Sequence, residues 1–229
     1  MTARESHLVE LVDADGVALG SATVADAHTT PGQLHRAFSV FLRDPSGRVL
    51  LQQRAPAKTR FPLRWANTCC GHPLPDEPLT VAAARRLVEE VGVADVPLTE
   101  VGVYAYYAED PATGRVEYEY DHVLVGDLPI GVRPTPDPDE VADLRWVSVP
   151  ALLAELESDS RPYAPWLLGV TQRLASSSGL ASSSSRLAVP SSRLAVPSSG
   201  LAVPSSGSAA SSSGLAASVD AGFVEPDGR

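Results

Sequence analysis

The C-terminal part of this 229-residue chain is of low complexity, which limits how much of it can fold around a core. From about Ala175 onward serine, alanine, leucine, valine, proline and glycine predominate, and a near-repeat reads RLAVPSS, RLAVPSS and GLAVPSS over residues 186–206. A proline in every repeat excludes a continuous helix or coiled coil. No aromatic residue lies between Trp166 and Phe223 to build a core. We therefore predict one folded domain, residues 1–174, followed by a disordered tail, residues 175–229.

The net charge of −10 belongs to the predicted domain, because Arg186, Arg193 and Arg229 in the tail balance Asp220, Glu225 and Asp227. An acidic domain argues against nonspecific binding of nucleic acid, which needs a basic surface. The sequence shows no secretory signal peptide and no apolar run of membrane length. Its two cysteines are adjacent, a poor arrangement for a structural disulfide. These features predict a cytoplasmic protein that binds neither nucleic acid nor membranes.

Sequence patterns typical of β-strands recur along the domain, with few helical patterns between them. Two hairpins are predicted near the N-terminus, residues 8–19 around the turn 13–16 and residues 36–53 around the turn 44–47. Further strands are predicted over 101–107, 116–125 and 144–149, and helices over 80–91, 150–157 and 165–174. This order predicts an α/β fold.

A spaced run of residues begins at Gly71. It continues with Glu77, Arg85, Glu89 and Glu90, and Gly92 is placed to cap the C-terminal end of the predicted helix. The spacing resembles the Nudix box, a loop–helix–loop whose glutamates normally hold a divalent ion against a diphosphate. This resemblance implies a Nudix-like α/β/α sandwich with a mixed sheet. A Nudix hydrolase would carry a further glutamate directly after Arg85, where this chain has Arg86.

Further motifs follow one another in order and narrow the resemblance. They are HT at 28–29, LHRAFS at 34–39, QRA at 53–55, Lys58, WANTCCGHP at 65–73, EYE at 117–119 and PW at 165–166. Over residues 5–174 the chain resembles the type I isopentenyl-diphosphate Δ-isomerases. The resemblance implies an enzyme of isoprenoid biosynthesis, monomeric or homodimeric, that interconverts isopentenyl and dimethylallyl diphosphate, a small-molecule prenyl diphosphate substrate.

Three histidines and two glutamates form a set of candidate metal ligands: His28, His35, His72, Glu117 and Glu119. The two glutamates share one strand face, because strand side chains alternate. Imidazoles and carboxylates together suit Mn²⁺, Mg²⁺ or Zn²⁺. The resemblance assigns all five to one metal centre and places Cys70 among the metal-binding residues as well.

A second ion is implied at the diphosphate. By resemblance Glu90 holds a Mg²⁺ that bridges to the substrate diphosphate, with Glu89 beside it. We place Arg54, Lys58 and Arg86 on the diphosphate, since cationic side chains match phosphate oxygens. Relatives often have a lysine four residues before the first metal histidine, where this chain has Val24. One expected diphosphate contact is thereby missing.

Moving a double bond requires one group that gives a proton and one that takes a proton. We predict Cys70 for one role and Glu119, assisted by Tyr107, for the other. The face of Trp166 could stabilise a carbocation. Cys69 is interpreted as a buried neighbour, since the resemblance places the reactive thiol next to Gly71.

Two alternatives remain at this stage. One is a Nudix pyrophosphohydrolase, which Arg86 disfavours. The other is a catalytically inactive Nudix domain that binds a ligand or partner, with the tail as a tether. The combination of Cys70, Glu119 and three histidines disfavours this second alternative, because no binding role requires it.

Overall fold

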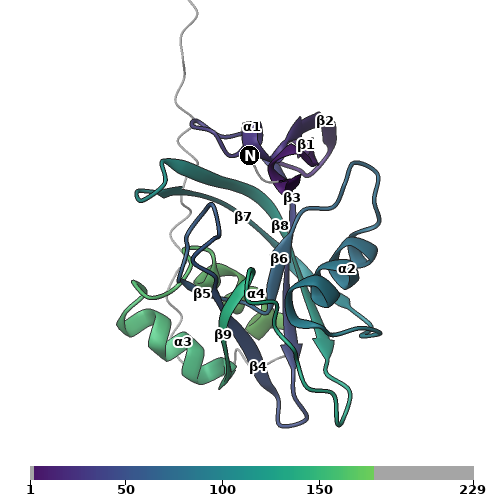
Figure 1. The fold of residues 1–229 in the computed structure, drawn as a ribbon, viewed down its shortest axis with the longest axis vertical. Coiled ribbons are helices and arrows are strands. Elements are labelled where there is room, and N and C mark those ends of the chain that lie inside the picture. Colours follow the sequence, from purple (N-terminus) through teal and green to yellow (C-terminus); the bar gives the residue numbers. More distant parts are fainter. Residues whose placement is uncertain (1–2, 178–229) are drawn as a thin grey trace, which may run out of the picture. The chain divides into compact units, whose positions relative to one another are not determined.

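The computed structural model describes residues 3–177 (Figure 1). The predicted tail lies outside the described residues from residue 178 onward. The last helix, α4, continues to Ser177, and Ala175 is buried in the core beneath it. The helix therefore continues three residues beyond the expected boundary at 174, and its packing against the core continues to Ala175.

A mixed sheet forms the centre of the domain. Its members are β1 (Leu8–Val12), β2 (Ala18–Thr23), β3 (His35–Arg43), β4 (Arg48–Arg54), β5 (Trp65–Ala66), β6 (Cys69–Gly71), β7 (Thr99–Asp110), β8 (Arg115–Asp127) and β9 (Val141–Ser148). β3 is central: it pairs with β1, β4 and β6 in antiparallel fashion and with β8 in parallel fashion. β4 pairs with β5 and β9, and β7 pairs with β8.

Two hydrophobic cores cover the two faces of this sheet. The helices α3 (Val149–Ser158) and α4 (Leu167–Ser177) pack on one face, against strand residues such as Phe41 and Val123. The helix α2 (Leu79–Val91) packs on the other, against neighbours such as Leu42 and Leu124. Strand alternation sends successive side chains to opposite faces. The result is a three-layer arrangement with helices on both sides of the sheet (Figure 1).

The helix α2 matches its predicted range closely. Its buried residues include Ala83, Leu87 and Val91, which recur at helical spacing, and Gly92 ends it in the left-handed conformation with φ of 65°. A Cβ on Gly92 would lie 2.8 Å from the carbonyl oxygen of Thr135. Glycine is therefore required there by both conformation and space.

One predicted hairpin is looser than expected. β3 and β4 pair only at Arg43 and Val49, next to their turn, and then separate. Each strand obtains its other partners from distant segments, β3 from β6 and β8, β4 from β5 and β9. Four short elements were not predicted: the 3₁₀ turn η1 (Ala3–Ser6), the helix α1 (Val24–Ala27) and the strands β5 and β6. Among residues 3–177 no helix is long and apolar enough to cross a membrane.

Candidate active site and metal centre

Three neighbouring strands bring the candidate residues together. β3 lies between β6 and β8, so that Ser39 faces Cys70 on one side while His35 faces Glu119 on the other. His28 follows α1 directly, and His72 follows β6. The candidates therefore surround the N-terminal half of β3.

The imidazoles of His28, His35 and His72 form a triangle, with ring centroids 4.6, 4.9 and 5.2 Å apart. One ligand atom from each ring and one from Glu119 all lie within 4.8 Å of one another. The Nε2 atom of His72 is 2.9 Å from Oε1 of Glu119, and Nε2 of His28 is 2.9 Å from Oε2 of Glu117. Four of the five candidate ligands thus surround one centre, and the fifth, Glu117, adjoins it through His28.

The hydrogen bonds of two imidazoles direct their lone pairs to this centre. Nδ1 of His28 lies 2.7 Å from the carbonyl oxygen of Val24, and Nδ1 of His35 lies 2.7 Å from that of Gln33. A carbonyl only accepts, so each Nδ1 carries the proton, and in the neutral ring Nε2 offers a lone pair. Both Nε2 atoms and Oε2 of Glu117 are buried without a hydrogen-bond partner in the described part of the chain. A cation among these lone pairs satisfies them, so the residues fit a divalent metal.

The protonation states also suit a metal. Burial lowers the pKa of His35 and His72 well below the usual range, and neighbouring imidazoles lower it further, so these rings are neutral at neutral pH. Burial alone would raise the pKa of Glu117, but Arg60 and His28 hold it well below its usual range. Burial and the charge of Glu117 raise the pKa of Glu119 to about 8. Without metal, Glu119 is therefore mostly protonated at neutral pH, while Glu117 is ionised.

Cys70 lies beside this centre, at the margin of the core under α3 and α4 and in contact with polar side chains. Its thiol donates to Oδ1 of Asn67 over 3.2 Å, and the hydroxyl of Ser39 is 3.6 Å from the sulfur. Burial and nearby Asp121 raise the pKa of the Cys70 thiol to about 12, so that it stays protonated at neutral pH. The sulfur is not a member of the His/Glu cluster among the described residues. Its geometry fits a proton donor better than the metal-ligand role that the resemblance implied.

Cys69 points the other way. It is fully buried among residues of the core under α2, while Cys70 packs towards the core under α3 and α4. Adjacent residues of β6 face opposite sides of the sheet, which explains the difference.

The tyrosine beside Glu119 is Tyr106, and the prediction of Tyr107 was wrong. The hydroxyl of Tyr106 donates to Oε2 of Glu119 over 2.7 Å, and the side chain is buried. Tyr107 is 42% exposed and donates to Glu109. The register of the β7–β8 hairpin places Tyr106 directly opposite Glu119, on the same face, and Tyr107 opposite Tyr118.

Trp166 is buried at the edge of the site. Its indole nitrogen donates to the same Asn67 oxygen that accepts from Cys70, over 3.0 Å, and its ring lies tilted against Tyr106 at 5.9 Å. The guanidinium of Arg54 lies over the Trp166 ring at 5.3 Å and donates to the carbonyl oxygens of Arg60 and Phe61. We therefore reinterpret Arg54 as a residue that fixes the loop 55–64, since its donors are directed to main-chain oxygens.

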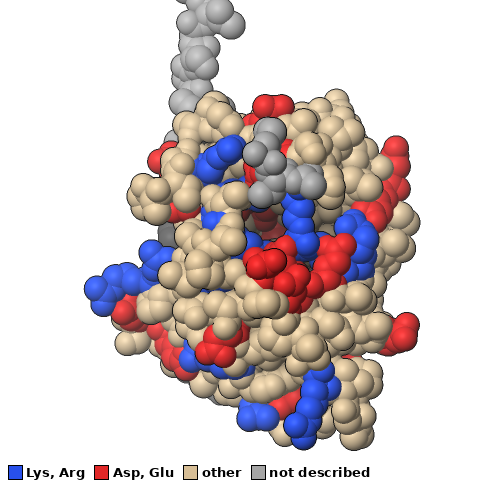
Figure 2. Space-filling model, in the orientation of Figure 1, with Lys and Arg blue, Asp and Glu red and all other residues tan. Residues whose placement is uncertain are grey.

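The candidate diphosphate residues form a second cluster, around Glu90. Oε1 of Glu90 contacts both Arg86 and Lys58, the latter over 3.3 Å, and Oε2 accepts from Gln52 over 2.6 Å. Lys58 also contacts Glu140, and Arg86 donates to the half-exposed Glu89. Acidic and basic side chains gather side by side on this face of the molecule in Figure 2. Burial would raise the pKa of Glu90, but Lys58 and Arg86 lower it, so the carboxylate is ionised.

Several residues of these clusters were not predicted: Ser39, Gln52, Arg60, Asn67, Asp121 and Glu140. Asn67 and Ser39 are part of the quoted motifs, and this position in the sequence is the signal that could have identified them. The structure shows that both side chains are buried. Glu140 reaches Lys58 across 82 residues of sequence through the pairing of β4 with β9, which no local pattern announces. Val24 is buried against Val9 and supports the site through its carbonyl oxygen alone.

Replacement of each of the two adjacent tyrosines by phenylalanine tests this geometry. Tyr106→Phe removes a hydrogen bond to a carboxylate, an interaction worth about 1.5–3 kcal/mol, so turnover should fall by roughly 10- to 100-fold. Tyr107→Phe is the matched control and should change turnover less than about twofold, because an exposed hydroxyl loses little. Steady-state kinetics of both variants decide the matter. Greater sensitivity at Tyr107 would contradict the hairpin register.

Comparison with known proteins identifies the family of this chain. The model of the NUDIX domain matches residues 33–167. The "Isopentenyl-diphosphate Delta-isomerase" of Nocardia farcinica is 60% identical over 164 residues, which cover 72% of this chain and 92% of that protein. The protein of the same name from Streptomyces coelicolor is 49% identical over 166 residues, covering 72% and 82%.

A solved structure supports the fold. The protein DR0079 from Deinococcus radiodurans superposes with a TM-score of 0.58 at 19% identity, over 73% of this chain and 98% of that one. This likeness concerns the fold alone and, with the matched domain, confirms the predicted Nudix-like α/β class with a mixed sheet. The two relatives add the more specific assignment, since the identity extends over nearly the whole length of one of them. The chain therefore belongs to the isopentenyl-diphosphate Delta-isomerases, a family built on the NUDIX domain.

Proposed function

We propose that this isomerase moves the double bond of isopentenyl diphosphate by proton transfer at Cys70 and Glu119, and so forms dimethylallyl diphosphate. Addition of a proton at C4 leaves a tertiary carbocation, and loss of a proton from C2 forms the new double bond. The observation that carries the proposal is the placement of two proton-carrying groups on either side of β3, the partly buried thiol of Cys70 and the buried carboxyl group of Glu119. One proton enters and one leaves, so no oxidant or second substrate is needed.

The environment of each group supports its role. The thiol of Cys70 has a pKa raised to about 12, so it holds a proton that it can give to carbon. The hydroxyl of Tyr106 donates to Oε2 of Glu119, and Nε2 of His72 lies 2.9 Å from Oε1, so both oxygens of Glu119 have fixed neighbours. The rings of Trp166 and Tyr106 contact each other beside Asn67 and Glu119. An indole face attracts a cation by about 2 kcal/mol when water is excluded. Burial of these groups also keeps water from quenching a carbocation.

His28, His35, His72, Glu117 and Glu119 would hold the divalent ion of the imidazole centre. When bound, such an ion stabilises the ionised form of Glu119 and lowers its pKa. The mixed nitrogen and oxygen donors suit Mn²⁺, Zn²⁺ or Mg²⁺.

The Glu90 cluster would take the diphosphate and its Mg²⁺. Lys58 and Arg86 neutralise Glu90 in the structure, and an arriving diphosphate offers them alternative oxygens. Glu90 is then free to bind the Mg²⁺ that accompanies the substrate. The absence of a lysine at Val24 leaves Lys58 and Arg86 as the principal cations of this cluster. A cytoplasmic location and a monomeric or homodimeric state remain predictions from the sequence.

Arg86 disfavours the alternative of pyrophosphate hydrolysis. A guanidinium stands where a hydrolase would need an acid, and it forms ion pairs with Glu89 and Glu90. These carboxylates are thereby less able to assemble the several metal ions that activate water.

Metal binding should release a proton from Glu119. The carboxyl has a pKa of about 8 without metal, so at pH 7 it is mostly protonated, and coordination requires the carboxylate. We expect nearly one proton released per ion at pH 7 and almost none at pH 9, with affinity rising up to about pH 8. Calorimetry in buffers of different ionisation enthalpy measures this release. Equal proton release at both pH values would contradict the protonation of Glu119 in the metal-free protein.

Isotope uptake tests the reaction itself. Purified protein with isopentenyl diphosphate and Mg²⁺ in D₂O should form dimethylallyl diphosphate with deuterium in the methyl group derived from C4. Because the reaction is reversible, deuterium should also enter C2 of the remaining substrate. Nuclear magnetic resonance follows both positions. Release of phosphate without isomerisation would contradict the proposal in favour of hydrolysis.

A further inference from the structure

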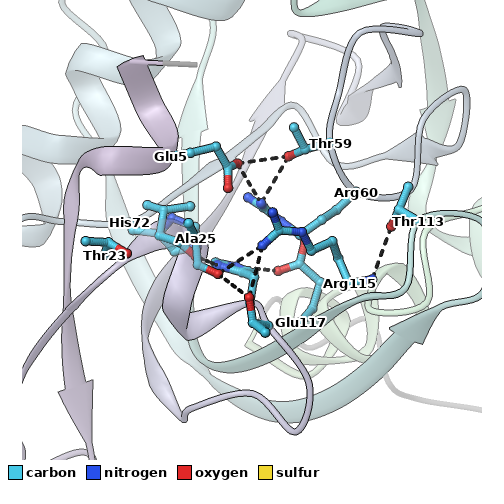
Figure 3. Close-up of polar contacts among 12 residues, drawn as sticks. Glu5, Thr23, Ala25, Thr59, Arg60, His72, Thr113, Arg115 and Glu117 are labelled. Atoms are coloured by element: carbon cyan, nitrogen blue, oxygen red, sulfur yellow. Dashed lines mark hydrogen bonds and ion pairs between the residues drawn. The ribbon is translucent and has the colours of Figure 1, made fainter. Parts of the chain in front are cut away.

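We propose that Arg60 and Glu5 form a clamp on the outside of the metal centre, in which Arg60 positions Glu117 and Glu5 holds Arg60 in place. The inference rests on the proposed metal site and extends it to the N-terminal turn η1. Figure 3 shows the arrangement, with Glu5 and Glu117 on either side of the Arg60 guanidinium. Both are positioning residues, since neither faces the centre of the imidazole triangle.

Arg60 determines which oxygen of Glu117 faces the metal centre. Its Nε donates to Oε1 of Glu117 over 3.0 Å, while Oε2 lies 2.9 Å from Nε2 of His28. A carboxylate held in this way offers one oxygen to an ion and not two. Arg60 therefore favours coordination through Oε2 alone and keeps that oxygen aimed among the imidazoles.

Glu5 holds the other side of the guanidinium. Its Oε1 accepts from Nη1 of Arg60 over 3.0 Å and from the hydroxyl of Thr59 over 3.0 Å. Glu5 is only 5% exposed although it lies near the start of the chain, and a carboxylate is rarely buried unless it is paired. Burial would raise its pKa, but Arg60 and Thr59 hold it below the usual range, so the pair is ionised. The turn η1 is thus linked to Glu117 through Arg60.

The backbone that carries Arg60 is fixed independently. Its carbonyl oxygen accepts from Arg54, and the next residue, Phe61, donates its N–H to Asp110 over 2.8 Å. Phe61 has φ of 46°, a left-handed conformation that costs a bulky residue about 1–3 kcal/mol and persists only where the surroundings impose it. A loop held in this way presents the Arg60 side chain at one fixed position.

The charges couple the clamp to the ion. Glu5 and Glu117 are ionised and share the single positive charge of Arg60, so one negative charge is left for a divalent ion to balance. If Glu5 strengthens metal binding through Arg60, then metal must strengthen the docking of η1 by the same factor. Metal loading should therefore protect the N-terminal turn.

Titration with Mn²⁺ alone tests the clamp, with free Mn²⁺ followed by electron paramagnetic resonance. We expect Arg60→Gln to raise the Kd for Mn²⁺ by about 10- to 100-fold, as loss of a group that orients a ligand does. Glu5→Gln should raise the Kd several-fold. The double variant should bind no more weakly than Arg60→Gln, because Glu5 acts through Arg60. Arg64→Gln, in the same loop and exposed, is the matched control and should bind like the parent.

Hydrogen exchange supplies a second readout. Mn²⁺ should slow amide exchange over residues 3–7 in the parent and not in Arg60→Gln. Should Arg60→Gln unfold, Glu5→Gln still decides the matter, since it replaces one oxygen by an isosteric amide. Unchanged Mn²⁺ affinity in a folded Arg60→Gln or Glu5→Gln protein would overturn the clamp and leave the metal site standing. A parent protein that binds no Mn²⁺ would overturn the metal site and the clamp with it.

Discussion

Replacement of Cys70 by alanine should lower turnover by about 10³- to 10⁴-fold and leave a folded, metal-binding protein. The thiol is the proposed donor of the proton to carbon, and alanine retains neither the proton nor the contact with Asn67. The fold should tolerate the change, because Cys70 is only partly buried and is not a member of the core under α2. Single-turnover kinetics and a Mn²⁺ titration measure the two properties separately.

Cys69→Ala is the matched control. This side chain is fully buried under α2, so its truncation should cost stability, about 1 kcal/mol, and change turnover less than about tenfold. Cys70→Ser is a sharper variant, since a hydroxyl keeps a donor for Asn67 but is a weaker acid than the thiol. It should remain far below the parent. Similar losses in the two alanine variants would contradict the assignment of Cys70.

Much of the framework could be predicted from local sequence. The helix α2 follows from apolar residues at helical spacing and from Gly92, because both its face and its end are determined within one short segment. The three histidines could be predicted by resemblance, and the structure brings their rings together. Such features depend on a few neighbouring residues or on a motif, so an isolated sequence carries them.

Strand pairing was harder to predict. Tyr106 and Tyr107 have the same local sequence preferences, and only the length of the turn between β7 and β8 decides which of them faces Glu119. Asp110 pairs with Arg115, and from that register Tyr106 must lie opposite Glu119. The contact between Lys58 and Glu140 depends in the same way on the distant pairing of β4 with β9. Residues whose contacts depend on the register of strand pairing could therefore not be predicted from local sequence.

Arg86→Gln should weaken both the fold and the binding of substrate. Arg86 contacts Glu89, Glu90 and Glu140, and Glu90 is only 2% exposed. Removal of Arg86 leaves Lys58 as the only ion-pair partner of buried Glu90 among the described residues, and loss of one partner from such a buried cluster costs up to about 3–5 kcal/mol of stability. The lost contact with the diphosphate should raise KM by roughly 10- to 100-fold, since a hydrogen bond between charged groups contributes about 1.5–3 kcal/mol.

Two further variants separate these effects. Arg85→Gln removes the neighbouring arginine, whose side chain is 41% exposed and pairs with Glu77, so both stability and KM should change little. The double variant Arg86→Gln/Glu140→Gln removes one negative charge together with the positive one and leaves Lys58 to Glu90, so it should recover stability. KM should stay high, because no cation returns to the diphosphate. Thermal unfolding and steady-state kinetics measure the two quantities. If KM recovered together with stability, Arg86 would act only by balancing the charge of Glu90 and Glu140, and its proposed contact with the diphosphate would be wrong.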